Sequence, residues 1–544
     1  MTKVWQILHK SSANDLQSIL DVLLENRGLK TKKEKDDFFD PKDPSKISLK
    51  EFGISEVEVK KSIKRIKEGI AKKEKIIVYG DYDADGVCAT AILWEALYSL
   101  KANVLPYIPE RFSEGYGLNP ESIKKLKTDD PKLALIITVD NGIVAGEAVM
   151  EAKKLGIDVI ITDHHEPSKI KPKAFATVHT TKIGGAGVSW VFAREITKTN
   201  AGLELCAIGT IADQIPLLGS NRSLVKFGLM ELNKTKRPGV NSLFEEASII
   251  KGAIGTYEVG FMIAPRINAM GRLRHAIDSL RLLCTKSLSK AKDLSFEVGK
   301  ANKERQKILA EIVIATRIET KALENKKIIV VASETYHEGV IGLAAGRLVE
   351  EFYRPAIVFS KGEKFAKASA RSVSGFNIIE AIRKVEDLLI AAGGHPMAAG
   401  FTIESKNISK FEKRLLEASD SLLTDEVLQR KLKIDMEINF DKINLPLLEK
   451  LQDFEPTGLG NKPPIFVSKG VEVIDARTVG ADAKHLKLKL RQGSAVFSAI
   501  AFGFGGISKD LGLGVEIDIA YTPQINSWNG SKNIELMVRD ISTA

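Results

Sequence analysis

The sequence predicts an α/β protein with a doubly wound parallel sheet, a long connecting helix, a second and smaller α/β domain, and a C-terminal β-barrel. Three observations predict this fold class. Short Val/Ile runs alternate with helical patterns from about residue 75 to 225, which is typical of parallel strands covered on both faces. Residues 286–325 contain no Pro and only one Gly, as expected of one long helix. Residues 430–544 alternate short β-like runs with Gly-rich turns, which favours a small barrel.

Several domains are expected, because the chain has 544 residues and single cores rarely exceed roughly 250–300 residues. We expect an N-terminal extension that packs on the first domain, the first α/β domain, the connecting helix, the second α/β domain and the barrel. In that order they would span residues 1–50, 51–285, 286–325, 326–425 and 426–544.

Acidic and imidazole side chains stand where four apolar runs stop. The runs are 76–78, 136–139, 159–161 and 208–212, and we expect each of them to be a strand. Open parallel sheets bind ligands at the carboxyl ends of their strands, so these side chains should meet in one crevice. The set is Asp81, Asp83, Asp85, Asp140, Asp163, His164, His165 and Asp213.

So many carboxylates cannot all ionise at close range unless cations neutralise them. Carboxylates mixed with neutral imidazole suit Mn²⁺ better than Ca²⁺, and Mg²⁺ is also compatible. The number of carboxylates suggests two ions, a centre that supports attack of a metal-activated water on phosphorus. For any one Asp, a helix N-cap is the alternative interpretation. A calcium loop is disfavoured, because residues 81–86 follow a buried strand and no Glu stands at the twelfth position.

Four segments resemble the DHH phosphoesterase superfamily and, within it, the RecJ single-strand-specific exonucleases: 78–86, 138–142, 163–165 and 212–217. The resemblance implies the following roles. The metal ligands would be Asp83, Asp85, Asp140, His164 and Asp213, with Asp140 bridging, and His165 would face the scissile phosphate, with Asp163 orienting its neighbours and Asp81 also at the catalytic centre. Many superfamily members carry His where this chain has Tyr79, so Asp81 or water would have to replace that imidazole.

Substrate contacts are also implied by the resemblance. Ser369 and Arg371, with Gly394 and His395 of a Gly-Gly-His motif, match the phosphate-binding part of the DHH-associated domain. Two further stretches match cleft-lining motifs: the loop 109–117, with Arg111 and Tyr116, and the segment 265–273, where Asn268 and Arg272 are four residues apart and share one helical face. Arg111 suits a terminal 5′ phosphate, because Arg makes bidentate phosphate contacts.

The C-terminal barrel is expected to be an OB-fold that binds single strands through basic grooves and stacking aromatics. Candidate stackers are Phe502, Tyr521 and Trp528. A core position is the favoured interpretation for Phe502. Trp528 precedes the turn-forming Asn529-Gly530, so it is the best candidate for an exposed stacking residue.

Composition narrows the function further. The net charge is +10, and an acidic centre inside a basic protein fits a polyanionic substrate. The three cysteines have no paired spacing, which predicts reduced thiols in a cytoplasmic protein. No apolar run approaches the roughly 20 residues that span a bilayer, so no membrane association is expected, and we expect a monomer.

The leading hypothesis is a metal-dependent exonuclease that degrades single-stranded DNA from the 5′ end to mononucleotides, in DNA repair and recombination. Direction and DNA preference follow from the resemblance, which also suggests a helicase and a single-strand-binding protein as partners. One alternative is a phosphoesterase for short oligonucleotides or cyclic dinucleotides. A second is a non-catalytic nucleic-acid-binding scaffold.

Overall fold

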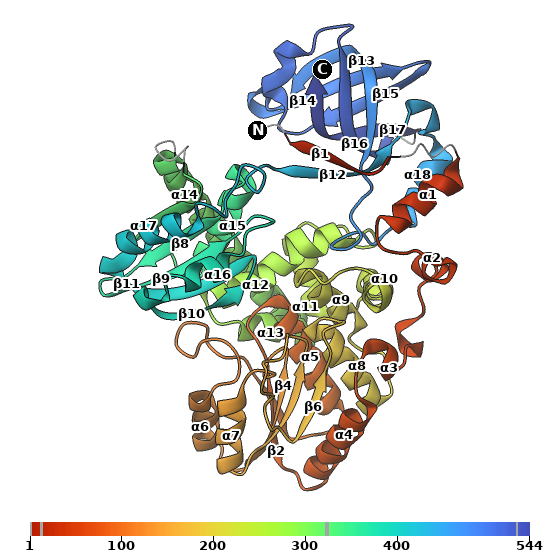
Figure 1. Ribbon diagram of the computed structural model, residues 1–544. Helices are drawn as coiled ribbons and strands as arrows, with labels where there is room; N and C mark the ends of the chain where they lie inside the picture. The colour runs from red at the N-terminus through yellow and green to blue at the C-terminus, as the bar shows by residue number, and fades with distance from the viewer. Residues whose placement is uncertain (1–2, 11–14, 321–325, 529–530, 544) are drawn as a thin grey trace.

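The computed structural model describes residues 3–10, 15–320, 326–528 and 531–543. Figure 1 shows three bodies: a parallel-sheet domain at the bottom, a second sheet domain at the left and a barrel at the top. The predicted fold class is confirmed. Each body has its own sheet, and the first sheet and the helices behind it carry the candidate site.

The first sheet has the order β3-β2-β4-β5-β6, and every neighbouring pair is parallel. Helices α4, α5 and α8 cover one face, and α6 and α7 cover the other. The strands are β2 (Lys75–Tyr79), β3 (Val104–Tyr107), β4 (Leu133–Val139), β5 (Asp158–Asp163) and β6 (Ala176–His179). The helices are α4 (Glu56–Ala71), α5 (Ala84–Ser99), α6 (Pro120–Asp129), α7 (Gly146–Lys154) and α8 (Gly185–Thr197).

One predicted strand is wrong. Residues 208–212 belong to helix α9 (Leu203–Ala212), and Asp213 is its C-cap residue. The helix is buried nearly all round and its sequence is mostly apolar. Periodicity cannot distinguish such a short apolar run from a buried strand. Asp213 therefore reaches the site from a helix C-terminus rather than from a strand end.

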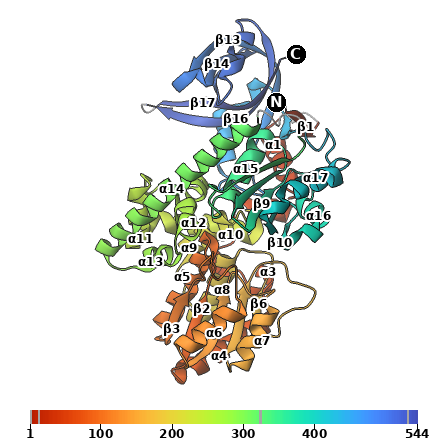
Figure 2. The same cartoon turned by 90° about the vertical axis from the view of Figure 1, so that its left-hand side faces the viewer.

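A helical layer follows and leads into the long connecting helix. It comprises α10 (Gly219–Lys234), α11 (Pro238–Glu246), the π-helix η2 (Glu258–Ile263), α12 (Ala264–Leu273) and α13 (Ile277–Cys284). Helix α14 (Leu288–Thr320) then carries the chain to the second sheet domain. Figure 2 shows it running diagonally from beside α11 and α13 toward α15. The helix was expected over 286–325, of which 321–325 lie outside the described residues.

The second domain has a mixed sheet of order β10-β11-β9-β8-β7, in which only β7 and β8 are parallel. Helix α15 and part of α14 cover one face, and α16 and α17 cover the other. The strands are β7 (Ile329–Ser333), β8 (Ala356–Lys361), β9 (Phe365–Arg371), β10 (Leu389–His395) and β11 (Ala398–Glu404). The helices are α15 (Ile341–Phe352), α16 (Ile378–Arg383) and α17 (Ile408–Ser419).

The C-terminal body is a closed barrel. Its five strands pair in the order β13-β14-β15-β17-β16, and β16 pairs back with β13 to close it. They are β13 (Phe466–Val479), β14 (His485–Gln492), β15 (Ala495–Ala501), β16 (Glu516–Trp528) and β17 (Ser531–Thr543). Strand β12 (Lys431–Glu437) links the second domain to the barrel, and α18 (Leu445–Gln452) precedes β13.

The first residues of the chain pack on the barrel, which corrects the expectation that residues 1–50 pack on the first domain. Strand β1 (Val4–His9) pairs with β12, and α1 (Leu16–Glu25) and α2 (Lys32–Phe39) contribute to the barrel core. Only the end of the segment, with α3 (Leu49–Phe52), joins the first core. Strand pairing across more than 400 residues leaves no local sequence signal, because it depends on where the barrel lies.

No helix within the described ranges is both long and apolar enough to cross a membrane.

Candidate active site

The first part of the site is built by the turn between β2 and α5. Asp83 is the N-cap of α5, and its Oδ1 accepts a hydrogen bond from Gly86 N at 2.9 Å. Asp85, in the first turn, accepts hydrogen bonds from the backbone of α8: Gly185 N donates at 2.7 Å and Ala186 N at 3.0 Å. The capping interpretation is thus correct for Asp83, and it coexists with a place in the acidic cluster.

Asp140 and His164 bring the ends of β4 and β5 to the same point. Asp140 has a left-handed backbone with φ +62°. His164 Nε2 lies 3.1 Å from Asp140 Oδ1, 3.6 Å from Asp213 Oδ2 and 4.0 Å from Asp85 Oδ2. One imidazole nitrogen therefore stands among three carboxylates that come from β4, α5 and the C-terminus of α9.

Burial disfavours charge on these carboxyl groups. Burial, followed by the neighbouring Asp83, raises the pKa of Asp81 well above its usual value. Burial, followed by the charge of Asp213, raises the pKa of Asp85 well above its usual value. Burial, followed by the charge of Asp85, likewise raises the pKa of Asp140. Burial and Asp83 raise the pKa of Asp213 to about 7. Four carboxyl groups that resist ionisation together need a cation to hold them as carboxylates.

The donor set fits divalent cations. Three groups of side chains have ligand atoms that lie within 4.8 Å of one another inside each group. The groups are Asp81, Asp83 and Asp140; Asp140, His164 and His165; and Asp85, His164 and Asp213. Asp140 belongs to two groups, and its buried Oδ1 accepts no hydrogen bond from the described residues. Burial, followed by His165, lowers the pKa of His164 to about 4, which keeps its nitrogen available to a metal. Carboxylate and imidazole together match the preference of Mn²⁺ and are compatible with Mg²⁺.

Asp163 fixes the orientation of His165. Its Oδ1 accepts hydrogen bonds from His164 N at 2.7 Å and His165 N at 3.1 Å, and it lies 2.8 Å from His165 Nδ1. Burial alone would lower the pKa of His165, but the hydrogen bond and the charge of Asp163 raise it to about 9. The Tyr116 hydroxyl lies 3.3 Å from His165 Nε2. His165 is thus a cationic, oriented group at the edge of the cluster, with Tyr116 beside it.

Tyr79 lies outside the cluster. Its ring is fully buried against Tyr107 in the core beneath α6 and α7, and its hydroxyl donates to Gly117 O at 3.1 Å. Asp81, two residues on, is grouped with Asp83 and Asp140 instead. Of the two replacements considered for the missing imidazole, Asp81 therefore stands at the cluster in this structure.

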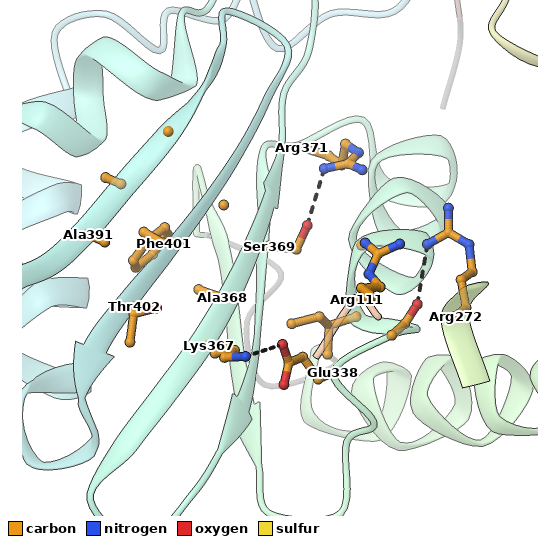
Figure 3. Close-up of a pocket in the computed structure, with 16 residues that line it drawn as sticks. Arg111, Arg272, Glu338, Lys367, Ala368, Ser369, Arg371, Ala391, Phe401 and Thr402 are labelled. Carbon is orange, nitrogen blue, oxygen red and sulfur yellow. Dashed lines mark hydrogen bonds and ion pairs between the residues drawn. The ribbon is translucent and has the colours of Figure 1, made fainter. Parts of the chain in front are cut away.

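A basic cavity adjoins this cluster between the first and second domains. Its volume is about 410 Å³, and Figure 3 shows Arg111, Arg272, Ser369 and Arg371 around it. The Arg111 guanidinium stacks on Tyr82 at 4.7 Å, and Arg371 Nη1 donates to Ser369 Oγ at 3.2 Å. Burial and then Arg111 lower the pKa values of Arg272, to about 10, and of Arg371. Three arginines that repel one another in a cavity form a site for a multiply charged anion.

The remaining predicted contacts are more scattered. Asn268 accepts a hydrogen bond from Ala84 N at 2.8 Å through its Oδ1, so it holds the start of α5 beside Asp83. His395 is exposed at the end of β10, and neither His395 nor Gly394 lines the cavity. Gly394 has φ +151°, and a Cβ there would meet Ala399 Cα at 2.6 Å, so it serves the close pairing of β10 with β11.

The aromatic residues predicted to stack on bases in the barrel differ in their exposure. Tyr521 is fully buried, so it is not available for stacking. Phe502 is 57% exposed and touches His485 edge-on, which overturns the expectation that it belongs to the core. Trp528 is the last residue of β16, and its side chain lies outside the described residues.

Lys367 and Glu338 also line the basic cavity and were missed from the sequence. Lys367 Nζ lies 2.5 Å from Glu338 Oε1. Strand alternation was the signal for Lys367, because it stands two residues before Ser369 and four before Arg371 on β9 and so shares their face. Glu338 lies in a turn before α15, and no sequence pattern marked it.

Three family models match the chain: the DHH family N-terminal domain over residues 75–210, the DHHA1 domain over 325–423 and the RecJ OB domain over 434–540. The single-stranded-DNA-specific exonuclease RecJ of Salmonella typhimurium is 31% identical, over 86% of this chain and 87% of that protein. The chain belongs to the RecJ family. The RecJ protein of Bacillus subtilis is 36% identical to this chain. The match covers 89% of this chain and 63% of the longer Bacillus protein.

Solved RecJ structures support the same assignment. The crystal structure of RecJ in complex with Mn²⁺ from Thermus thermophilus matches with a TM-score of 0.85 and 29% identity, over 99% of this chain and 80% of that one. A second structure of that RecJ contains Mg²⁺ and matches with a TM-score of 0.77 and 27% identity, over 99% of this chain and 78% of that one. The resemblance read from the motifs is confirmed, and the acidic and imidazole groups of this RecJ chain are placed for the same kind of ion.

Proposed function

We propose that this protein is a metal-dependent exonuclease that hydrolyses single-stranded DNA from its 5′ end and releases mononucleotides. One observation carries the proposal: three groups of carboxylate and imidazole side chains are linked into one cluster, because Asp140 belongs to two of them and His164 to two, and this cluster adjoins a cavity with three arginines. The metal cluster suits phosphodiester hydrolysis, and the cavity suits a terminal phosphate. The RecJ proteins to which the chain is similar are single-stranded-DNA-specific exonucleases, which supports the substrate class. The 5′ direction is proposed because the arginine cavity suits a terminal phosphate.

We assign the metal-holding role to Asp83, Asp85, Asp140, His164 and Asp213, with Asp81 as an additional ligand because it is grouped with Asp83 and Asp140. Two divalent cations bound there would supply an activated water and neutralise phosphate charge. The buried Oδ1 of Asp140, which accepts no hydrogen bond from the described residues, supports a bridging position for this carboxylate.

The chain's own residues then position the strand. Arg111, Arg272 and Arg371, with Ser369, would bind the 5′-terminal phosphate, and the scissile phosphate would lie over the acidic cluster. His165, protonated and held by Asp163, would stabilise charge on the phosphate or give its Nε2 proton to the leaving oxygen. Tyr116, next to that nitrogen, would limit how His165 can turn.

The relationship to RecJ proteins also supports three wider expectations. The protein would act as a cytoplasmic monomer, in DNA repair and recombination, and with a helicase and a single-strand-binding protein. Gel filtration would test the monomeric state, and co-purification would test binding to either partner, both separately from the activity.

The activity is tested with end-labelled single and double strands of both polarities, in Mn²⁺, Mg²⁺ or chelator. We expect mononucleotides from the 5′ end of single-stranded DNA only, and none in chelator. Preference for a dinucleotide over a long strand, or product that forms in chelator, would contradict the proposal.

Asp83→Asn is the variant of choice for that assay, because an Asn can still cap α5 while it removes a metal-binding charge. We expect a loss of cleavage of at least about 100-fold with strand binding retained. Asp37→Asn, which removes an exposed charge on α2, is the control and should leave cleavage unchanged.

A further inference from the structure

Two exposed aromatic residues stand at the start of the helix that passes the metal cluster. Tyr257 is 63% exposed and Phe261 is 71% exposed. Their rings are stacked, with centroids 5.1 Å apart and an interplanar angle of 29°. Large aromatic side chains normally bury their area, so a stacked pair left in solvent is available to a ligand with a flat face.

The pair belongs to the same helical segment as two residues of the cleft. Tyr257, Phe261, Asn268 and Arg272 follow one another along this segment at spacings of four, seven and four residues. The chain is helical from residue 256 through the π-turns of η2 to the end of α12. Between and beyond these residues, Val259, Ile263, Ile267 and Met270 of the same segment are buried.

Along this segment the four residues come in the order in which a bound strand would meet the phosphate cavity, the metal cluster and the aromatic pair. Arg272 lines the basic cavity, and Asn268 is hydrogen-bonded to Ala84 N beside Asp83. Phe261 stands seven residues before Asn268, which at 1.5 Å per residue is about 10 Å along the axis. Gly260, its neighbour, lies beside Ile211 of α9, two residues before Asp213. The helix therefore runs from the phosphate cavity, past the metal cluster, to the aromatic pair.

We propose that Tyr257 and Phe261 form a stacking site for bases of the single strand on the 3′ side of the scissile phosphate. This inference rests on the proposed exonuclease function and adds a binding site to it. Stacked bases are about 3.4 Å apart, so about 10 Å corresponds to roughly three nucleotides beyond the cluster. Stacking on an aromatic face tolerates every base, which suits an enzyme that must advance along any sequence.

Binding is measured by fluorescence anisotropy with a 5′-phosphorylated oligothymidylate in Ca²⁺, where cleavage is not required. The double variant Tyr257→Ala/Phe261→Ala should bind it about tenfold more weakly, with an unchanged slope of affinity against salt, because no phosphate contact is removed. Cleavage of a 5′-phosphorylated dinucleotide in Mn²⁺ should be unchanged, because that substrate ends before the aromatic pair. Tyr98→Ala, which removes another exposed aromatic of the same domain, is the matched control and should bind like the original protein.

Abasic substrates locate the contact. An oligothymidylate without bases at about the third to fifth positions should bind the unchanged protein about tenfold more weakly, and the double variant should lose nothing further. Phe261→Trp should retain binding of the complete strand. Equal binding by the double variant and the unchanged protein, or additive losses from variant and abasic sites, would overturn the stacking site. Absence of Mn²⁺-dependent cleavage by the unchanged protein would instead contradict the proposed exonuclease function.

Discussion

At the residue scale, the neighbouring imidazoles His164 and His165 acquire opposite properties from their surroundings. His164 faces three carboxylates and is held neutral by burial, whereas His165 is paired with Asp163 and is cationic at neutral pH. The two side chains differ because they point in different directions. The His164 ring points into the cluster, and the His165 ring points along the edge of the cluster toward Tyr116. These opposite properties suit the separate roles proposed for the two side chains, a metal ligand for His164 and a phosphate-facing acid for His165.

Asp163→Asn tests the orientation of His165. An amide cannot accept as strongly from two backbone N–H groups and an imidazole, so His165 should lose its fixed position and part of its basicity. We expect activity to fall about 10- to 100-fold, with nearly unchanged affinity for single-stranded DNA measured in Ca²⁺. Steady-state kinetics measure the loss of kcat, and the binding assay in Ca²⁺ measures the affinity. An equal loss in kcat and in affinity would argue for a general structural defect.

Asp140→Asn tests the electrostatic cost of the cluster. The pKa of Asp140 is raised by burial and by Asp85, so in metal-free protein its contribution to stability falls as the pH rises above its usual value near 4. At about pH 8 in chelator the variant should melt at a higher temperature than the original protein, because an Asn carries no charge and tolerates the left-handed backbone. The advantage should shrink at about pH 5.

The same Asp140→Asn protein should lose most of the stabilisation that Mn²⁺ gives the original protein, because ligand binding to the folded state raises its stability. Differential scanning calorimetry with and without Mn²⁺ measures both effects. An Asp140→Asn protein that is still fully stabilised by Mn²⁺ would remove Asp140 from the ligand set.

At the element scale, the site depends on how closely α8 and α9 approach the turn before α5. A Cβ at Gly185 would stand 2.5 Å from Asp140 Cγ, and one at Gly209 would meet Asp85 Oδ1 and Ala186 Cβ. Glycine at these two helix positions lets backbone N–H groups and carboxylates share one small volume. The N-terminus of α8 also directs two N–H groups at Asp85, which favours its charged form.

Gly185→Ala should therefore impair metal binding more than folding. The added methyl group must displace the Asp140 carboxylate, and overpacking of this kind costs about 1–3 kcal/mol. We expect Mn²⁺ affinity, measured by calorimetric titration, to fall at least about tenfold. Gly346→Ala, a helical glycine of α15 with open space at its Cβ, is the control and should leave Mn²⁺ affinity unchanged while stabilising the protein slightly.

At the scale of the whole molecule, one buried side chain ties the catalytic domain to the barrel. Arg222 of α10 is only 1% exposed, and it donates to the carbonyl oxygens of Phe38, Asp453, Phe454, Glu455 and Pro456. Its guanidinium also lies 3.9 Å from the Phe38 ring centroid. One cation thus satisfies backbone groups from the N-terminal segment and from the segment that leads into the barrel.

Arg222→Met should loosen the barrel from the catalytic domain. Several buried carbonyl groups would lose their donor, which costs about 3 kcal/mol or more in total. We expect faster limited proteolysis within residues 453–462 and a lower urea midpoint. Lys226→Met, one turn further along α10, removes a single longer hydrogen bond to Phe39 O and should change proteolysis little; equal effects of the two variants would contradict this role of Arg222.

Much of the fold could be read from local pattern. Runs such as 76–78 and 159–161 are strands because continuous Val/Ile stretches suit a sheet covered on both faces, and α14 is a helix because 286–320 contain no Pro and one Gly. The strand predicted at 208–212 was wrong because a short buried helix and a buried strand have similar apolar sequences. Lys367 could have been found by strand alternation. Glu338 lies in a turn that no sequence pattern marks, and the stacked pair of Tyr257 and Phe261 depends on the π-turns of η2, which the sequence does not reveal.

The sequence by itself determined the kinds of side chain available for the chemistry, since carboxylates and imidazoles at strand ends already require cations. It also determined the family, through motifs whose spacing is local. Only the tertiary structure decided that Tyr79 turns into the core while Asp81 joins the cluster, that Asp213 arrives from a helix, and that the N-terminal strand β1 pairs with β12 beside the barrel. These outcomes depend on packing between segments far apart in the chain, and burial and direction, which set the pKa and role of each group, exist only once those segments meet.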